Sequence, residues 1–293
     1  MEWERAKTYV LAILLLLNAA LGVLLFMENR RYTITSEQES HIRTILAENH
    51  ITMYRLPLRN FPPMRPIEVT GFYYDDATEQ KLVEIFFPNV PAVERVYTGR
   101  LGSRIFQYGN GRLEIASGFI EYRNTNVLAQ TDSTSMSSLR SLTREAARRQ
   151  ATDFVSSHFP DFVWDRDFEE GENVRIIFHQ KYRGVLVFSN FIELLVTPLG
   201  IQQVEMQFGK ILGHTGSPTI IFSPDEALLA FTQHVRHITQ EEPMTIRRMD
   251  LVYFQEYISD QEGPYHAVPF YRIFIEGNED IPFLINAFTN AIG

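Results

Sequence analysis

The chain of 293 residues carries 27 Lys and Arg against 36 Asp and Glu, giving a formal net charge of −9 and a pI of about 5.4. Nucleic-acid binding needs a concentrated basic surface, and this acidic balance argues against it. Cysteine is absent, which excludes disulfides, thiolate nucleophiles and cysteine-ligated metals. The hydrophobic content of 45% and aromatic content of 13% are typical of a packed globular protein.

The first feature in chain order is an uncharged apolar run from Tyr9 to Met27. Its length approaches the roughly 20 residues that an α-helix needs to cross hydrocarbon. A cleaved signal peptide would have a shorter apolar core and a small-residue cleavage site, whereas this run ends in Leu-Phe-Met-Glu-Asn-Arg-Arg. We therefore expect a short segment 1–8 and an uncleaved transmembrane helix 9–27.

Lys and Arg are equal in number on the two sides of this run, so the positive-inside rule does not orient it. The short leading segment and the large folded mass after the helix favour a cytoplasmic N-terminus. We expect a single-pass protein of the cell membrane with an extracellular C-terminal region.

Small residues follow one stripe of the expected transmembrane helix. Ala12, Leu15, Ala19 and Gly22 recur at three- and four-residue steps, with Asn18 at the margin. Small residues let a second helix approach closely, and an interhelical hydrogen bond stabilises such a pair by about 0.6–2 kcal/mol. The stripe is the predicted interface with a partner helix. The alternative is a generic anchor in which Asn18 bonds to its own backbone.

Residues 28–130 are predicted to form a β-rich part that opens with a short helix. Ser36 and Glu39 have capping-box spacing, which predicts a helix reaching Asn49. Tyr108–Gly111 has the composition of a tight hairpin, and the polar stretch Asn124–Ser138 predicts a loop or linker. The strand-forming runs are Ile67–Tyr74, Leu82–Phe87, Arg95–Gly99, Arg104–Tyr108 and Arg112–Tyr122.

The C-terminal half predicts two helix-plus-sheet units, 139–213 and 220–293. A helix from Leu142 to about Phe159 opens the first unit, and a capping box at Ser223 opens a helix in the second, about 80 residues after Thr143. The fold class is therefore α+β, with antiparallel sheets each packed by a helix. The strands expected are Asn173–Tyr182, Val185–Thr197 and Ile201–Phe208, then Ile246–Tyr257, Ala267–Gly277 and Ile281–Phe288.

The sequence contains no known catalytic or cofactor-binding motif. The sequence has no GxGxxG, GxxxxGK[ST] or GxSxG pattern. His234 and His237 have a ligand-like spacing, but no HExxH pattern accompanies them. Glu169, Glu170 and Glu172 are expected to be solvated in an acidic loop. We therefore expect no catalytic, cofactor-binding or metal site, and no small-molecule substrate.

The N-terminus resembles a known family. Met1-Glu-Trp-Glu-Arg-Ala-Lys-Thr8, followed directly by an apolar helix containing Leu17-Asn18, is similar to the opening of the YycI family. These are single-pass proteins of low-GC Gram-positive bacteria, related to the YycH family. The order of elements is similar over nearly the whole chain. The segment AVPFYRIFIEG also resembles a strand of PepSY-like modules.

This resemblance implies a non-enzymatic accessory regulator of the WalK (YycG) sensor histidine kinase, which controls cell-wall metabolism. It implies that the transmembrane helix associates with the kinase helices through Ala12, Leu15, Asn18, Ala19 and Gly22. It also implies that the outer region pairs with a YycH-like membrane protein, and that the N-terminus is cytoplasmic.

Two hypotheses of other classes remain open at this point. An extracytoplasmic enzyme or ligand-binding domain acting on cell-wall material would need a pocket with convergent polar groups. A PepSY-like inhibitor or chaperone of an exported hydrolase would bind its target through the soluble region alone.

Overall fold

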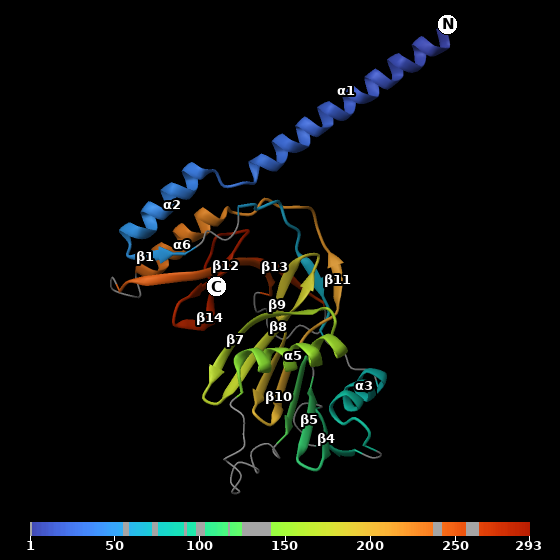
Figure 1. Cartoon of the computed structure of the whole chain (residues 1–293), viewed down its shortest axis with the longest axis vertical. Coiled ribbons are helices and arrows are strands. Elements are labelled where there is room, and N and C mark those ends of the chain that lie inside the picture. Colours follow the sequence, from blue (N-terminus) through green and yellow to red (C-terminus); the bar gives the residue numbers. More distant parts are fainter. Residues whose placement is uncertain are drawn as a thin grey trace. The chain divides into compact units, whose positions relative to one another are not determined.

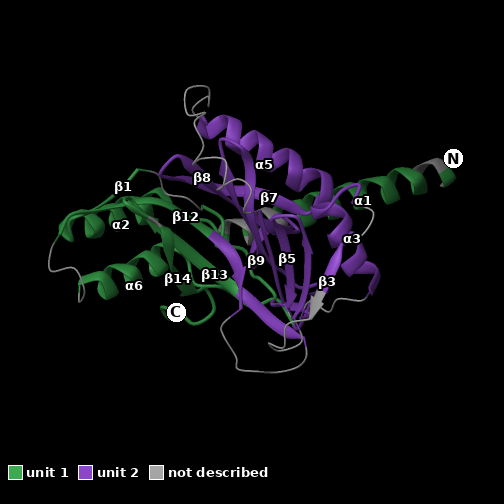
Figure 2. Cartoon of the chain, turned by 90° about the horizontal axis from the view of Figure 1, so that it is seen from below, with its two compact units in different colours: residues 1–65, 217–250, 269–293 green, residues 66–216, 251–268 purple. Residues whose placement is uncertain are grey.

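The computed structural model describes residues 2–54, 59–71, 76–90, 93–97, 103–116, 118–124, 142–236, 242–255 and 264–293. The chain forms two compact units, coloured separately in Figure 2. Unit 1 comprises residues 1–65, 217–250 and 269–293, and unit 2 comprises residues 66–216 and 251–268. Each unit is built from segments that are far apart in the sequence.

Helix α1 (Glu2–Arg31) contains the predicted membrane segment (Figure 1). Within it, Ala6–Leu24 is a 19-residue stretch with a mean hydropathy of 2.0, none of which is buried. Among the described residues this is the one helix long and apolar enough to cross a bilayer. The sequence prediction of one N-terminal apolar helix followed by an α+β fold is confirmed.

The rest of unit 1 combines two helices with short sheet segments. Helix α6 buries Leu228 and Phe231, and the ring of Phe231 packs edge-on at 5.2 Å from that of Phe283. β1 pairs with β12 in parallel, and β13 pairs with β14 antiparallel. The elements are α2 (Ser36–Glu48), β1 (Ile51–Met53), α6 (Pro224–Arg236), β12 (Met244–Phe254), β13 (Tyr265–Ile275) and β14 (Asn278–Asn286), the ends of β12 and the start of β13 belonging to unit 2.

The capping box of α2 lies one residue before the predicted one. Thr35 is the N-cap residue, and its Oγ1 accepts a hydrogen bond from the backbone N–H of Gln38 at 3.2 Å. The Gln38 side chain accepts in return from the Thr35 backbone N–H at 2.9 Å. Glu39, expected to close the box, instead pairs with Arg43 at 3.1 Å. At α6 half of the predicted capping box is observed: Glu226 accepts from the Ser223 backbone N–H at 2.8 Å, and it also accepts from the Ser223 hydroxyl at 2.8 Å.

Unit 2 is an antiparallel sheet covered by a helix. The strand order is β3-β4-β5-β6-β10-β9-β8-β7, and β2 pairs with β11 and with the first part of β13. β9 also pairs in parallel with the last part of β12. The elements are β2 (Ile67–Val69), α3 (Asp76–Phe86), β3 (Glu94–Tyr97), β4 (Arg104–Tyr108), β5 (Gly111–Ala116), β6 (Phe119–Asn124), α5 (Arg144–His158), β7 (Phe162–Glu170), β8 (Asn173–Tyr182), β9 (Val185–Thr197), β10 (Gly200–Gln207) and β11 (Ile211–His214).

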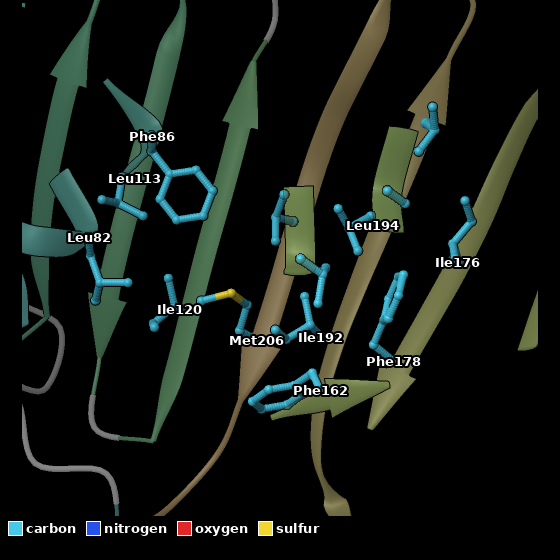
Figure 3. Packing of buried hydrophobic residues seen from close by; sticks show 14 of the residues in the cluster. Leu82, Phe86, Leu113, Ile120, Phe162, Ile176, Phe178, Ile192, Leu194 and Met206 are labelled. Atoms are coloured by element: carbon cyan, nitrogen blue, oxygen red, sulfur yellow. The ribbon is translucent and has the colours of Figure 1, made fainter. Parts of the chain in front are cut away.

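The core of unit 2 lies between α5 and one face of this sheet. Ala147, Ala151 and Val155 recur at helical steps and are buried. The strands contribute every second side chain, because successive residues point to opposite faces. Figure 3 shows the packed side chains, which include Leu113, Ile120, Phe178, Ile192, Leu194 and Met206. The two expected helix-plus-sheet arrangements are thus present, one around α5 and one around α6.

Two sequence predictions for unit 2 are wrong, and two strands were missed. Leu82–Phe87, expected as a strand, forms most of helix α3, because Leu82 and Phe86 are one helical turn apart and share a buried face. Arg112–Tyr122, expected as one strand, is divided into β5 and β6 by a turn at Gly118, whose φ is +76°. The missed strands are β7 and β11, where the sequence analysis predicted no strand.

Strands β8 and β9 have the predicted bounds. Of the predicted strand Ile67–Tyr74, only Ile67–Val69 is a strand, and 72–74 lie outside the described residues. The other predicted strands agree to within a few residues where the structure describes them. The hairpin at Tyr108–Gly111 is confirmed, with Gly109 at a φ of +57°. The predicted loop Asn124–Ser138 lies almost wholly outside the described residues.

A glycine in unit 2 permits close contact between two backbones. A Cβ added to Gly209 would lie 1.9 Å from the carbonyl oxygen of Thr70, which is backbone and cannot rotate away. Asn190, fully buried, donates to the Gly209 carbonyl at 3.0 Å and accepts from its N–H at 3.3 Å. The Gly209 backbone is therefore held between the Thr70 backbone and the Asn190 side chain.

Gly209→Ala is expected to destabilise the protein by about 3 kcal/mol or more, because overpacking against fixed backbone forces neighbouring segments apart. Thermal unfolding followed by circular dichroism would measure the change. Gly71→Ala is the matched control, since a Cβ there meets no atom within 4 Å. Equal melting temperatures for the two variants would contradict the assigned contact.

Candidate functional site

The five residues predicted as a helix interface lie on α1, and all are exposed. At 3.6 residues per turn, the stripe from Ala12 to Gly22 covers an arc of about 120° on the helix surface. A Cβ at Gly22 would meet no protein atom within 4 Å. The stripe is therefore accessible to a neighbouring helix along its whole length.

Asn18 forms a hydrogen bond within its own helix. Its Nδ2 donates to the Leu14 carbonyl at 2.9 Å, so the backbone-bonded alternative is the arrangement observed. An asparagine amide has two N–H groups and a carbonyl acceptor, and this bond uses one N–H. The Asn18 side chain therefore keeps hydrogen-bonding capacity for a second helix.

A groove lies between α2 and α6 in unit 1, and no sequence motif indicated it. Its volume is about 340 Å³. The two helices are in contact, although their sequences are separated by most of the chain. Figure 1 shows them side by side. The lining residues are Glu37, Gln38, His41, Ile42, Ile45, Asp225, Glu226 and Leu229.

Asp167 joins α5 to the sheet of unit 2. Its side chain is fully buried and accepts hydrogen bonds from Arg144, from Arg148 Nε at 2.7 Å and from Trp164 Nε1 at 2.9 Å. Burial by itself would raise the pKa of Asp167, but the bonds and charges of Arg148 and Arg144 outweigh it and lower the pKa. The carboxylate is a structural anion that docks the helix.

A second enclosed charge centre lies on β7 and β8. His179 Nε2 is 3.5 Å from Asp165 Oδ2, and both side chains are 2% exposed. Arg166 donates to the same Asp165 oxygen at 2.7 Å, while His179 Nδ1 lies 3.3 Å from the Asn190 carbonyl. A carboxylate beside a histidine is a catalytic combination in other settings, but such complete burial leaves no access for a substrate. We assign the group a structural role.

Four glutamates form a row across the other face of this sheet. Directly opposed pairs link Glu114 to Glu121, Glu121 to Glu205, and Glu205 to Glu193. Arg112 pairs with Glu114 at 2.9 Å, and arginines also pair with Glu121 and Glu193.

Glu205 receives its hydrogen bond from the neutral amide of Gln203. Burial raises the pKa of Glu205, and the charges of Glu193 and Glu121 raise it further. Like charges directly opposite in a sheet are destabilising, so Glu205 is the strained member of the row.

The predicted histidine pair gives no metal site in the described part of the chain. His234 lies on α6 with its ring 6.2 Å from that of Phe283, and His237 lies outside the described residues. Among the residues that the structure describes, no group of three or more His, Asp or Glu is placed to hold a metal ion. Glu169 and Glu170, expected in a loop, are the last residues of strand β7.

Comparisons with known proteins bear on the fold. No protein-family model and no curated protein matches the sequence. A crystal structure of an uncharacterized protein from Eubacterium rectale is similar, with a TM-score of 0.57 and 10% identity over 82% of this chain and 88% of that chain. The YpeB C-terminal domain of Bacillus megaterium has a TM-score of 0.43 and 11% identity over 75% of this chain and 95% of that domain. The first similarity concerns the fold alone.

Asp167→Asn is expected to lower stability by about 2–3 kcal/mol at neutral pH, because hydrogen bonds to a buried charged group are lost. The lowered pKa means that the native carboxylate contributes stability above about pH 4, lost as the pH falls through the native pKa. The deficit of the variant should therefore shrink in acid. Denaturant titrations from pH 7 to pH 3 would measure it, with the exposed Asp153→Asn as control; a deficit independent of pH would contradict the ionised contact.

Unlike Asp167→Asn, Glu205→Gln is expected to stabilise the protein, by about 0.5–1 kcal/mol at pH 7, because it removes a like-charge contact. A raised pKa in the folded state penalises stability once the group ionises, so the gain should vanish below about pH 4. Thermal unfolding at the two pH values would test this. Glu172→Gln, at an exposed turn position, is the control and should change stability little at either pH.

Proposed function

We propose that the chain is a single-pass membrane protein that regulates another membrane protein by binding to it. The observation that carries the proposal is the 19-residue apolar segment of α1, which has no buried residue and carries the stripe described above. An apolar helix of this length is stable in lipid, where small residues and a polar amide favour association with another helix. The proposal requires no catalytic step.

The resemblance to the YycI family supplies the proposed partners. The kinase would be a sensor histidine kinase of the WalK type, which controls cell-wall metabolism. The region after α1 would be extracellular and would pair with a YycH-like membrane protein. Strand β3 and strand β7 each pair with one neighbour among the described residues, so both offer sheet edges for such pairing.

Regulation by α1 would act through differential affinity. A helix that binds one conformation of a kinase more tightly than the other shifts the population toward that conformation. A difference of about 1.4–3 kcal/mol, or roughly 10–150-fold, is within the usual range of such coupling.

The first experiment is co-purification of the full-length chain from membranes of its host, beside a chain whose residues 9–27 are replaced by an unrelated span. Recovery of a sensor kinase with the native helix and its loss with the replacement would support the proposal. If no membrane protein is recovered with either chain, the proposal is overturned, and action on a soluble ligand or exported hydrolase becomes the better hypothesis.

Asn18→Leu combined with Gly22→Leu is expected to weaken kinase association about tenfold, because interhelical packing and hydrogen bonding are worth about 1–2 kcal/mol in a bilayer. Quantitative recovery of the kinase would measure the effect. Leu17→Ala combined with Leu24→Ala, on the opposite side of the helix, is the matched control and should leave recovery unchanged. Unchanged association in the stripe variant would exclude this stripe as the contact.

A further inference from the structure

The groove between α2 and α6 has an apolar floor. Ile42 is 3% exposed and Ile45 is half-buried, while Leu229 on α6 is 39% exposed. A volume of about 340 Å³ is at the lower end of ligand-binding cavities, so it holds a few side chains and no large ligand. A third helix could insert its apolar side chains between these two helices.

The rim of the groove is acidic. Glu37, Asp225 and Glu226 contribute three carboxylates, and no Lys or Arg is among the described residues that line it. The Glu226 carboxylate accepts hydrogen bonds from the backbone N–H and the hydroxyl of Ser223 at the start of α6. Glu37 and Asp225 also lie in first turns, where acids interact favourably with the helix dipole. The inference therefore depends on these acids lying beside an apolar floor, which helix ends do not require.

Asp225 is half-buried and lines the groove beside the apolar floor. Its Oδ1 is buried, and no donor reaches it among the described residues. A carboxylate at the edge of a groove favours a cationic side chain beside it, because hydrogen bonds between charged groups are stronger than neutral ones. The lining therefore offers apolar contacts together with negative charge.

We propose that this groove binds a basic amphipathic helical segment of a partner protein, with apolar side chains on Ile42, Ile45 and Leu229 and Lys or Arg beside Glu37 and Asp225. The inference rests on the proposed function, since it assigns the binding partner a second contact outside the membrane.

The chain keeps the groove near the membrane. Glu37 follows Leu24 by 13 positions, of which seven continue α1 and the rest span the turn into α2. Helical and extended residues rise about 1.5 Å and at most about 3.6 Å each, so Glu37 lies within about 35 Å of the end of the apolar segment. A juxtamembrane helix of another membrane protein is thus within reach, whereas anionic lipid headgroups would be repelled by the acidic rim.

The test uses the full-length chain in nanodiscs of phosphatidylcholine. Fluorescently labelled LKKLLKLLKKLLKL is the probe, and the acidic peptide LEELLELLEELLEL is its charge-reversed control. Empty nanodiscs measure partition of the peptide into lipid. We expect saturable binding of the basic peptide above this background, weakened at high salt because exposed charges are screened.

Glu37→Lys is expected to weaken binding about tenfold by reversing a rim charge. Glu48→Lys is the matched control, because Glu48 is exposed on the same helix and does not line the groove. Leu229→Ser should weaken binding through the floor, beside Ile220→Ser, an exposed residue of the same unit outside the groove. Circular dichroism of each variant would establish that it is folded.

A benzophenone on the peptide would locate the site by mass spectrometry. Cross-links within residues 36–48 and 224–236, with the pattern of variants above, would support the proposal. The proposal would be overturned if the basic peptide bound no better than to empty nanodiscs, or if the acidic peptide bound as well as the basic one. It would also be overturned if folded Glu37→Lys and Leu229→Ser bound the basic peptide as well as the unmodified chain, or if the cross-links lay elsewhere. The Asn18→Leu and Gly22→Leu variant should bind the peptide normally, so failure here is distinguishable from failure of the membrane contact.

Discussion

The alternation of side chains along the long antiparallel strands is the constraint on which unit 2 depends. On β10 it buries Val204 and Met206 and turns Glu205 to the other face. Because neighbouring strands pair in fixed register, the apolar faces join into one layer under α5, and the intervening glutamates are brought opposite one another. The continuous core and the repulsive row of acids are thus two results of the same geometry.

Ionic contacts add to the apolar packing of α5 and the neighbouring strand β7. Strand β7 presents acids to both faces of the sheet, and each buried acid meets a cation. Asp167 meets the arginines of α5, and Asp165 meets Arg166 and His179. Unpaired, either acid would make this strand unstable in the interior, because burying an isolated charge is costly. The docking of α5 therefore depends on charge as well as on shape.

Two of the apolar surfaces left uncovered in unit 1 lie along α1 and in the groove between α2 and α6. Burial of such surface is the main source of binding free energy. A protein that regulates by association needs surfaces of this kind, and it needs polar groups to select the partner. Asn18 and the first-turn acids of α2 and α6 are placed to do so.

The sequence alone was sufficient wherever the signal is local. The apolar run, the helix openings at Thr143 and Ser223, and strands β8 and β9 were all predicted, because caps, turns and side-chain periodicity depend on residues close in the chain. The stripe on α1 could be listed for the same reason. Whether it contacts another helix is not a property of one chain.

Tertiary structure decided the rest. Leu82–Phe87 has the composition of a strand but forms a helix, because Leu82 and Phe86 bury one helical face in the core. β7 has too many acids to be recognised as a strand without the arginines that neutralise them. The groove combines residues 37–45 with residues 225–229, which are far apart in the sequence. The row of glutamates exists only once the strand register is set. Such features depend on contacts distant in sequence, and local periodicity carries no information about which segments meet.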